Sequence, residues 1–115
     1  SELQSAAEGE RSAVVRERVM QARAIQRKRF EGIEGVHTNA RMNAAMVRTY
    51  CVLDEASDRL LKRAMERLSL SARAYDRILK VARTIADLAG RAQIAQSDVA
   101  EAIGYRSLDR GNWGV

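Results

Sequence analysis

Hydrophobic residues between Ser71 and Leu88 recur at steps of three and four, the spacing that places them on one face of an α-helix. Ser71 can cap the start of this helix, and Gly90 can end it in a left-handed turn. We therefore expect a central helix with one buried apolar stripe. The stripe comprises Ala74, Tyr75, Ile78, Leu79, Ala82, Ile85, Ala86 and Leu88.

The opposite face of the same segment is basic and should meet solvent. Asp76 and Asp87 each stand four positions from a basic residue, a spacing that favours ion pairs on a helix. The basic residues assigned to this exposed face are Arg73, Arg77, Lys80 and Arg83.

Two helical segments are predicted before residue 54. The first should begin at an N-cap on Ser12 and run to about Phe30, and residues 31–38 should form a glycine-containing loop. A short second helix should begin at Thr38 or Asn39 and end near Tyr50. Its buried side is assigned to Met42, Ala45 and Met46.

Two more segments complete the expected set of helices. Asp54 should begin a helix that ends near Leu68, with Glu55–Arg59 and Asp58–Lys62 as acid-before-base pairs. Its apolar stripe comprises Ala56, Leu60, Leu61, Ala64, Met65 and Leu68. A short helix from Gln96 to Ile103 should direct Val99, Ala102 and Ile103 inward.

These patterns predict an all-α protein, a small bundle of about four to five helices. The 115 residues are 46% hydrophobic but only 4% aromatic, so the core must be aliphatic, and the absence of proline suits packed helices. We expect a flexible lead-in over 1–11, one helical domain over 12–104 and a C-terminal tail over 105–115. The start on Ser1 rather than Met favours a piece of a longer protein.

Several classes of site are incompatible with this composition. Cys51 is the only cysteine and His37 the only histidine, which argues against a disulfide framework and a Cys/His metal site. No apolar run approaches the ~20 residues of a membrane span, and no signal peptide is present. We expect a soluble, cytoplasmic protein with no metal of its own and no membrane partner.

The first predicted helix carries most of the positive charge. Seven basic residues and one acid, Glu17, lie between Arg11 and Arg29, and the net charge of the whole chain is +5. This excess suits an ordinary solvated face, a nucleic-acid surface or contact with an acidic neighbouring subunit. No aromatic residues interleave to stack on bases. The candidate interaction residues are Arg16, Arg23, Arg27 and Lys28.

The segment Tyr50–Glu55, YCVLDE, looks like a Walker B element that holds magnesium. Its companion, the G-x-x-x-x-G-K-[ST] phosphate-binding loop, is absent, and the glycines are scattered. We therefore interpret Asp54 as a helix cap. No serine stands beside a base and no second histidine is available, so no catalytic residue is assigned.

Several blocks of the sequence nevertheless resemble one family in the right order. They are VRERVMQARAIQRKRF, YCVLDEAS, SARAYDRILKVARTIADLAG, the I-x-x-x-x-V-A-E-A-I pattern at Ile94–Ile103, and YRSLDRGNWG. Together they are similar to the C-terminal helical lid of the magnesium-chelatase-like AAA+ ATPases of the YifB/ComM branch. One departure is Asn43-Ala44, where relatives often carry Thr-Pro, which leaves the start of the second helix open.

The resemblance implies a role for this domain in a larger ATPase. It implies that ATP and Mg bind to an upstream core of the same chain, that subunits form a hexameric ring, and that DNA is a candidate partner. Arg73 of the S-A-R motif corresponds to the sensor-2 arginine that reaches the γ-phosphate of ATP, and Arg77 is the second candidate. The domain alone should not hydrolyse ATP. A stand-alone basic DNA-binding module and a scaffold bundle remain the alternatives.

Overall fold

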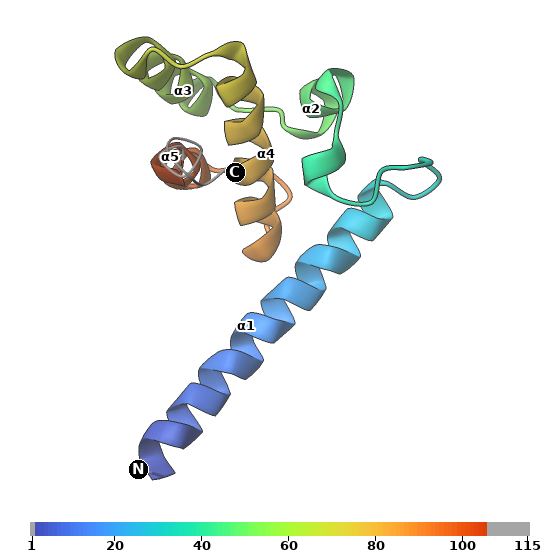
Figure 1. Ribbon diagram of the computed structural model, residues 1–115, viewed down its shortest axis with the longest axis vertical. Helices are drawn as coiled ribbons and strands as arrows, with labels where there is room; N and C mark the ends of the chain where they lie inside the picture. Colours follow the sequence, from blue (N-terminus) through green and yellow to red (C-terminus); the bar gives the residue numbers. More distant parts are fainter. Residues whose placement is uncertain (1, 106–115) are drawn as a thin grey trace, which may run out of the picture.

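Helix α4 (Ala72–Leu88) occupies the centre of the fold, as its long apolar stripe predicts (Figure 1). In the computed structural model, which describes residues 2–105, α1, α2 and α5 pack against this helix, and α3 packs against α5. The other helices are α1 (Glu2–Arg29), a single 3-10 turn η1 (Asn39–Arg41), α2 (Ala44–Tyr50), α3 (Glu55–Leu68) and α5 (Gln96–Gly104). No strand occurs within 2–105, and the five α-helices confirm the all-α prediction.

Two of the predicted helix caps, Asp54 and Ser71, are present in the structure. The Asp54 carboxylate accepts a hydrogen bond from the Ser57 backbone N–H at 2.7 Å, and the Ser71 hydroxyl accepts one from Ala74 at 3.2 Å. The hydrogen bonds from Ser57 also lower the pKa of Asp54. Gly90, at φ +74°, adopts the left-handed conformation expected after α4. The interpretation of Asp54 as a cap rather than a metal ligand is therefore supported by its geometry.

The core is aliphatic and continuous between the helices. Leu61 of α3, Ile78 of α4 and Val99 of α5 are all buried in it. Phe30 and Tyr50 meet edge to face, with ring centroids 5.7 Å apart. Burial raises the pKa of the Cys51 thiol to about 11, so this cysteine is a packing residue that stays protonated at neutral pH.

Two predicted helix starts were wrong. Helix α1 begins at Glu2 rather than at Ser12, so the expected lead-in is helical. Helix α2 is capped by Asn43, whose side-chain oxygen accepts from the Met46 N–H at 2.9 Å, whereas Thr38 only precedes η1. The start of this helix had been left open because Asn43-Ala44 stands where relatives often carry Thr-Pro. A new acceptor at position 43 lets the helix begin one turn later than Thr38 or Asn39 would allow.

Three predicted faces also differ in detail. Ala45 and Ala56 are exposed; Val47 is the buried residue of α2, and in α3 Ser57 is buried together with the predicted Leu61 and Ala64. Both exposed alanines lie in the first turn of their helices. The largest difference is Arg83, which was assigned to the exposed face of α4 and is only 5% exposed. Of the tail predicted at 105–115, the part from residue 106 onward lies outside the described residues.

Truncation of core residues tests this packing. Leu61→Ala and Ile78→Ala should each lower the free energy of unfolding by about 2 to 5 kcal/mol, because each leaves a cavity between tightly packed helices. Val52, 64% exposed, is the matched control. Val52→Ala should change the free energy of unfolding by about 0.5 kcal/mol or less. Urea unfolding followed by circular dichroism measures all three. Equal midpoints for Leu61→Ala and Val52→Ala would contradict the assigned core.

Candidate functional site

Arg73 and Arg77 lie one turn apart on the exposed side of α4, close to its N-terminus. Both line a shallow pocket of about 530 Å³, together with Lys80 from the next turn and the acidic Asp76. Lys80 is held in place by a hydrogen bond from its Nζ to the carbonyl oxygen of Ala40, at 3.2 Å. Three cationic side chains against one carboxylate make this pocket suited to an anion. The structure thus brings together the two arginines singled out from the sequence.

The other end of α4 is fixed by a buried carboxylate. Asp87 is fully buried, and Arg29 at the end of α1 donates two hydrogen bonds to it, at 2.7 and 2.8 Å. Asn39 of η1 donates to the same carboxylate at 2.8 Å and accepts from Arg29 at 2.8 Å. The backbone N–H of Asn39 in turn donates to Gln26 of α1 at 3.0 Å. This network joins α1, η1 and α4.

Arg83 belongs to this buried network and not to the solvent-facing surface. Its guanidinium donates to the carbonyl oxygens of Arg91 at 2.9 Å and Ala92 at 3.1 Å, and its Nε lies 3.3 Å from Asp87. These contacts anchor the segment that leads from α4 to α5. The sequence showed that Arg83 and Asp87 are four residues apart, so their pairing is confirmed. The direction of the pair, into the protein, was missed.

A second ion pair, between an exposed arginine and a buried carboxylate, fixes the start of α5. The carboxylate of Asp98 is buried, pairs with Arg91 and accepts from the Ala95 N–H at 2.8 Å. The Asp98 contact raises the pKa of Arg91. The spacing of the sequence placed Asp98 in the predicted helix Gln96–Ile103 but gave no sign that it would pair with Arg91, seven residues earlier.

The four basic residues predicted to form an interaction surface on α1 are all exposed. Arg16, Arg23 and Arg27 follow one another at helical spacing, and Arg23 and Arg27 border a hollow beside His37 in the 31–38 loop. Lys28 points about 100° away from Arg27 around the helix axis. Three of the four residues therefore form one stripe, and Lys28 lies apart from it.

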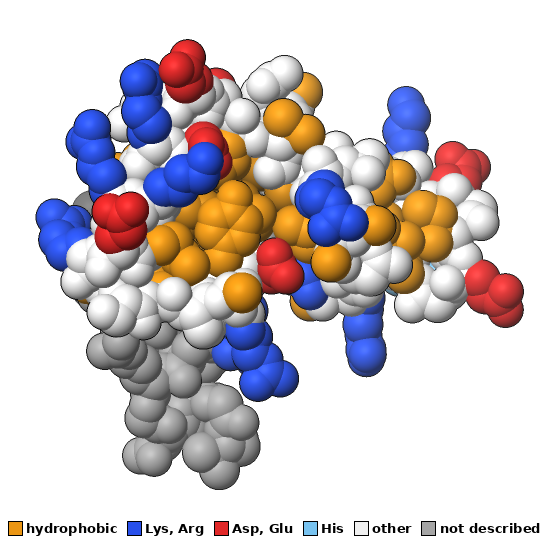
Figure 2. Space-filling model, turned by 90° about the horizontal axis from the view of Figure 1, so that it is seen from above, with side chains coloured by type: hydrophobic (Ala, Val, Ile, Leu, Met, Phe, Trp, Pro, Cys, Tyr) orange, Lys and Arg blue, Asp and Glu red, His pale blue; other side chains and the backbone are white. Residues whose placement is uncertain are grey.

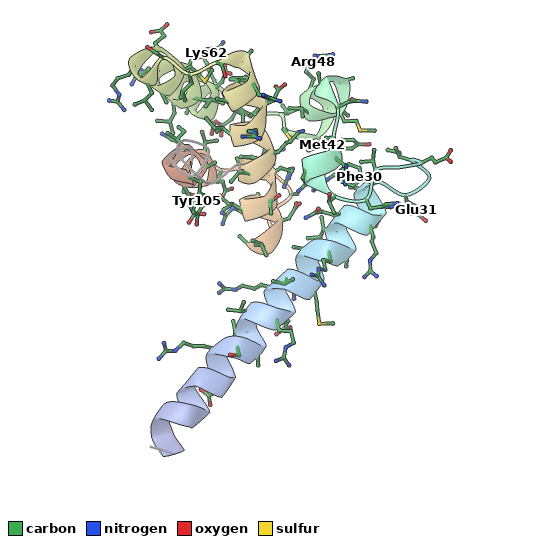
Figure 3. All side chains as sticks on the ribbon, in the orientation of Figure 1. Phe30, Glu31, Met42, Arg48, Lys62 and Tyr105 are labelled. Atoms are coloured by element: carbon green, nitrogen blue, oxygen red, sulfur yellow. The ribbon has the colours of Figure 1, made fainter. Side chains whose placement is uncertain are left out.

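Figure 2 shows the end of the domain that holds α2 and α3 (Figure 1), with hydrophobic side chains gathered between charged ones. Figure 3 places Lys62 and Arg48 on that same end, far from the first half of α1. Within the described part of the chain, no group of acidic, histidine or cysteine side chains could hold a metal ion. None of the helices described has the length and apolarity needed to cross a bilayer.

Comparison with known proteins places this architecture in context. Residues 9–106 match the family model described as Magnesium chelatase, subunit ChlI C-terminal. Competence protein ComM of Haemophilus influenzae is 47% identical over 102 residues, which is 89% of this chain and 19% of that protein. Uncharacterized protein YifB of Salmonella typhimurium is 41% identical over 107 residues, 93% of this chain and 20% of that protein.

The YifB protein of Escherichia coli is also similar, with 40% identity over 102 residues, 89% of this chain and 19% of that protein. The chain spans about a fifth of the length of the curated relatives it matches. No solved structure gives a significant match.

The buried network around Asp87 should be essential for stability. Asp87→Ala leaves Arg29 and Arg83 without their buried counter-charge, and we expect it to lower the free energy of unfolding by about 3 to 5 kcal/mol. Asp58→Ala is the control, because it removes only the exposed Asp58–Lys62 pair and should cost about 1 kcal/mol or less. Chemical denaturation measures the free energy of unfolding of both variants. Similar losses of stability in Asp87→Ala and Asp58→Ala would show that Asp87 does not hold the helices together.

Proposed function

Because the chain belongs to the family described as Magnesium chelatase, subunit ChlI C-terminal, we propose that it forms the helical lid of a larger AAA+ ATPase. In this role it contributes Arg73 to the binding of ATP and performs no catalysis alone. The observation that carries the proposal is the position of Arg73. It is exposed in the first turn of the central helix and shares a pocket with two further cations.

The chemistry of the pocket suits a triphosphate. A guanidinium donates two parallel hydrogen bonds to phosphate oxygens, and the unpaired N–H groups at a helix start add positive potential. Arg73 stands two residues after the Ser71 cap, within that first turn. Its helix is held at the far end by Asp87 and along its length by the core, so the backbone that carries Arg73 is rigid. A rigid support lets small movements of the whole lid bring the arginine to the nucleotide or withdraw it.

The phosphates themselves must come from outside this domain, since its sequence has no phosphate-binding loop. We propose two sources of bound ATP with Mg: the upstream core of the same longer chain, or a neighbouring subunit of a hexameric ring. In both arrangements Arg73 senses the γ-phosphate and Arg77, one turn later, is the second contact. The relatives are about five times as long as this chain, which is consistent with such a core.

Replacement of Arg73 should separate function from folding. Arg73→Ala should change the stability of the isolated domain by about 0.5 kcal/mol or less, because the side chain is exposed. In the full-length ATPase it should reduce ATP turnover about tenfold or more, the effect of losing a charge-assisted contact of about 1.5 kcal/mol or more. Arg73→Lys should restore part of the activity, because lysine retains the charge without the fork of donors.

The control for this experiment is Arg63→Ala, which removes an exposed arginine from α3 and should leave turnover unchanged. Arg83→Ala cannot serve, because Arg83 is internal. Unaltered turnover in Arg73→Ala, measured by phosphate release at saturating and at low ATP, contradicts the proposed contact.

A second candidate function, nucleic-acid binding, is favoured by the stripe formed by Arg16, Arg23 and Arg27. Arg23 and Arg27 are one turn apart, about 6 Å along the helix axis, so both can contact the same phosphate backbone. Between Arg11 and Arg29 the stripe has only one acid near it, Glu17. The stripe offers contacts to a phosphate backbone and none to base edges, so binding would be independent of sequence.

Arg16, Arg23 and Arg27 replaced together by Gln should weaken binding to a short duplex and lower the salt slope by about 2 to 3, since each lost phosphate contact contributes about 0.9. The matched control replaces Arg59, Arg63 and Arg67, three exposed arginines of α3, by Gln. Fluorescence anisotropy at a series of salt concentrations gives both slopes. Equal weakening by the two triple variants would indicate a general charge effect and would eliminate the stripe as a site.

A further inference from the structure

A hollow of about 400 Å³ lies between the second half of α1 and the loop of residues 31–38. Figure 1 shows this loop at the C-terminal end of α1. None of the lining residues is acidic, and none of them lines the pocket around Arg73. The lining residues are Met20, Arg23, Gln26, Arg27, His37 and Thr38.

Two guanidinium groups supply the charge of this hollow. Met20, Arg23 and Arg27 follow one another at steps of three and four, so they lie on one face of α1. Both arginines are exposed, and neither forms an ion pair with a carboxylate within residues 2–105. Their N–H donors are therefore available to an oxyanion, the partner that a guanidinium binds best.

The remaining polar groups of the hollow can also donate. The side-chain oxygen of Gln26 accepts from the backbone N–H of Asn39 at 3.0 Å, so its NH2 group faces another partner. Asn39 is itself fixed by the buried carboxylate of Asp87, which holds the Gln26 amide in one orientation. The hydroxyl of Thr38 makes no capping hydrogen bond. With the imidazole of His37, these groups surround the hollow with donors.

Two acids lie near the hollow without closing it. Glu31 and Glu34 of the loop border an adjoining hollow together with Arg27 and His37. Both acids are exposed, and neither pairs with Arg27 or His37 in the described part of the chain. The two arginines thus retain an uncompensated positive charge at the hollow itself, which favours a ligand with more than one negative charge.

We propose that this hollow binds the phosphate monoester of a nucleotide, with the base or sugar against Met20. A phosphate monoester carries about two negative charges at neutral pH and three terminal oxygens, enough for two guanidinium groups and several neutral donors. A phosphodiester has a single charge and would leave some of these donors unused. Met20 is 62% exposed, and its thioether offers a polarizable apolar surface to a base.

This site differs from the two functions proposed above. The ATP contact uses Arg73 in another pocket. The basic stripe needs only arginines along one face of α1, whereas the hollow also depends on Gln26, Thr38 and His37. The monoester can come from a free mononucleotide or from the phosphorylated end of a strand, because both present the same group.

His37 is the only histidine of the chain, so the NMR signals of its ring report directly on this hollow. Titration with AMP at constant pH should shift them along a saturable curve, whereas adenosine, which lacks the phosphate, should leave them in place. Arg27→Gln should weaken the apparent affinity for AMP about tenfold, because a charge-assisted hydrogen bond is lost. Arg16→Gln is the matched control, since Arg16 is exposed but does not line the hollow, and it should leave the affinity unchanged.

Two further comparisons complete the experiment. A short single strand with a 5′-phosphate that saturates the His37 signals at lower concentration than AMP identifies a strand end as the source, and the reverse order identifies a free nucleotide. Arg73→Ala should retain the response of His37, which separates this site from the ATP contact. Equal responses to AMP and adenosine overturn the proposal, as does an unchanged affinity in Arg27→Gln. Inorganic phosphate that binds as tightly as AMP overturns the contact with Met20.

Discussion

The arrangement of the helices depends on one buried carboxylate, that of Asp87. It lies near the end of the central helix and is held by Arg29 from α1 and Asn39 from η1, with the guanidinium of Arg83 beside it. A buried charge is tolerated only when its partners are fixed around it, so the carboxylate specifies where α1 must end. Burial of apolar surface supplies most of the stability, but it does not select this arrangement by itself.

This constraint explains how one short domain can present two distinct surfaces. Helix α4 buries Ile78, Leu79 and Ala82 against its neighbours, while Arg73 and Arg77 near its start are exposed on the other side. Helix α1 is packed against the bundle through its second half, where Ala22 and Phe30 are buried, and its first half projects away. The anion pocket thus lies on the most supported helix, and the basic stripe on the most extended one.

The candidate site was predictable where it depends on local rules. Arg73 follows a helix cap and opposes an apolar stripe, and both facts can be read from spacing alone; the structure agrees that the residue is exposed. Arg83 has the same residue type and was assigned to the same exposed face, but it lies about 80° around the helix axis from Arg73 and is buried. The difference arises because carbonyl oxygens of residues 91 and 92 return to α4 at that level and require donors. No periodicity in α4 reveals where a later loop will pass.

The sequence by itself determined the helical class, the central helix, its cap at Ser71, the cap at Asp54 and the glycine turn at position 90, because these depend on neighbours within a few residues. Tertiary structure alone decided that Arg29 meets Asp87, 58 positions away, that Arg83 turns inward, and that Ala45 and Ala56 stay in solvent. Those outcomes depend on which surfaces of separate helices meet. Local spacing sets which face of a helix is apolar, whereas the packing of the whole chain sets how far along its length that face is covered.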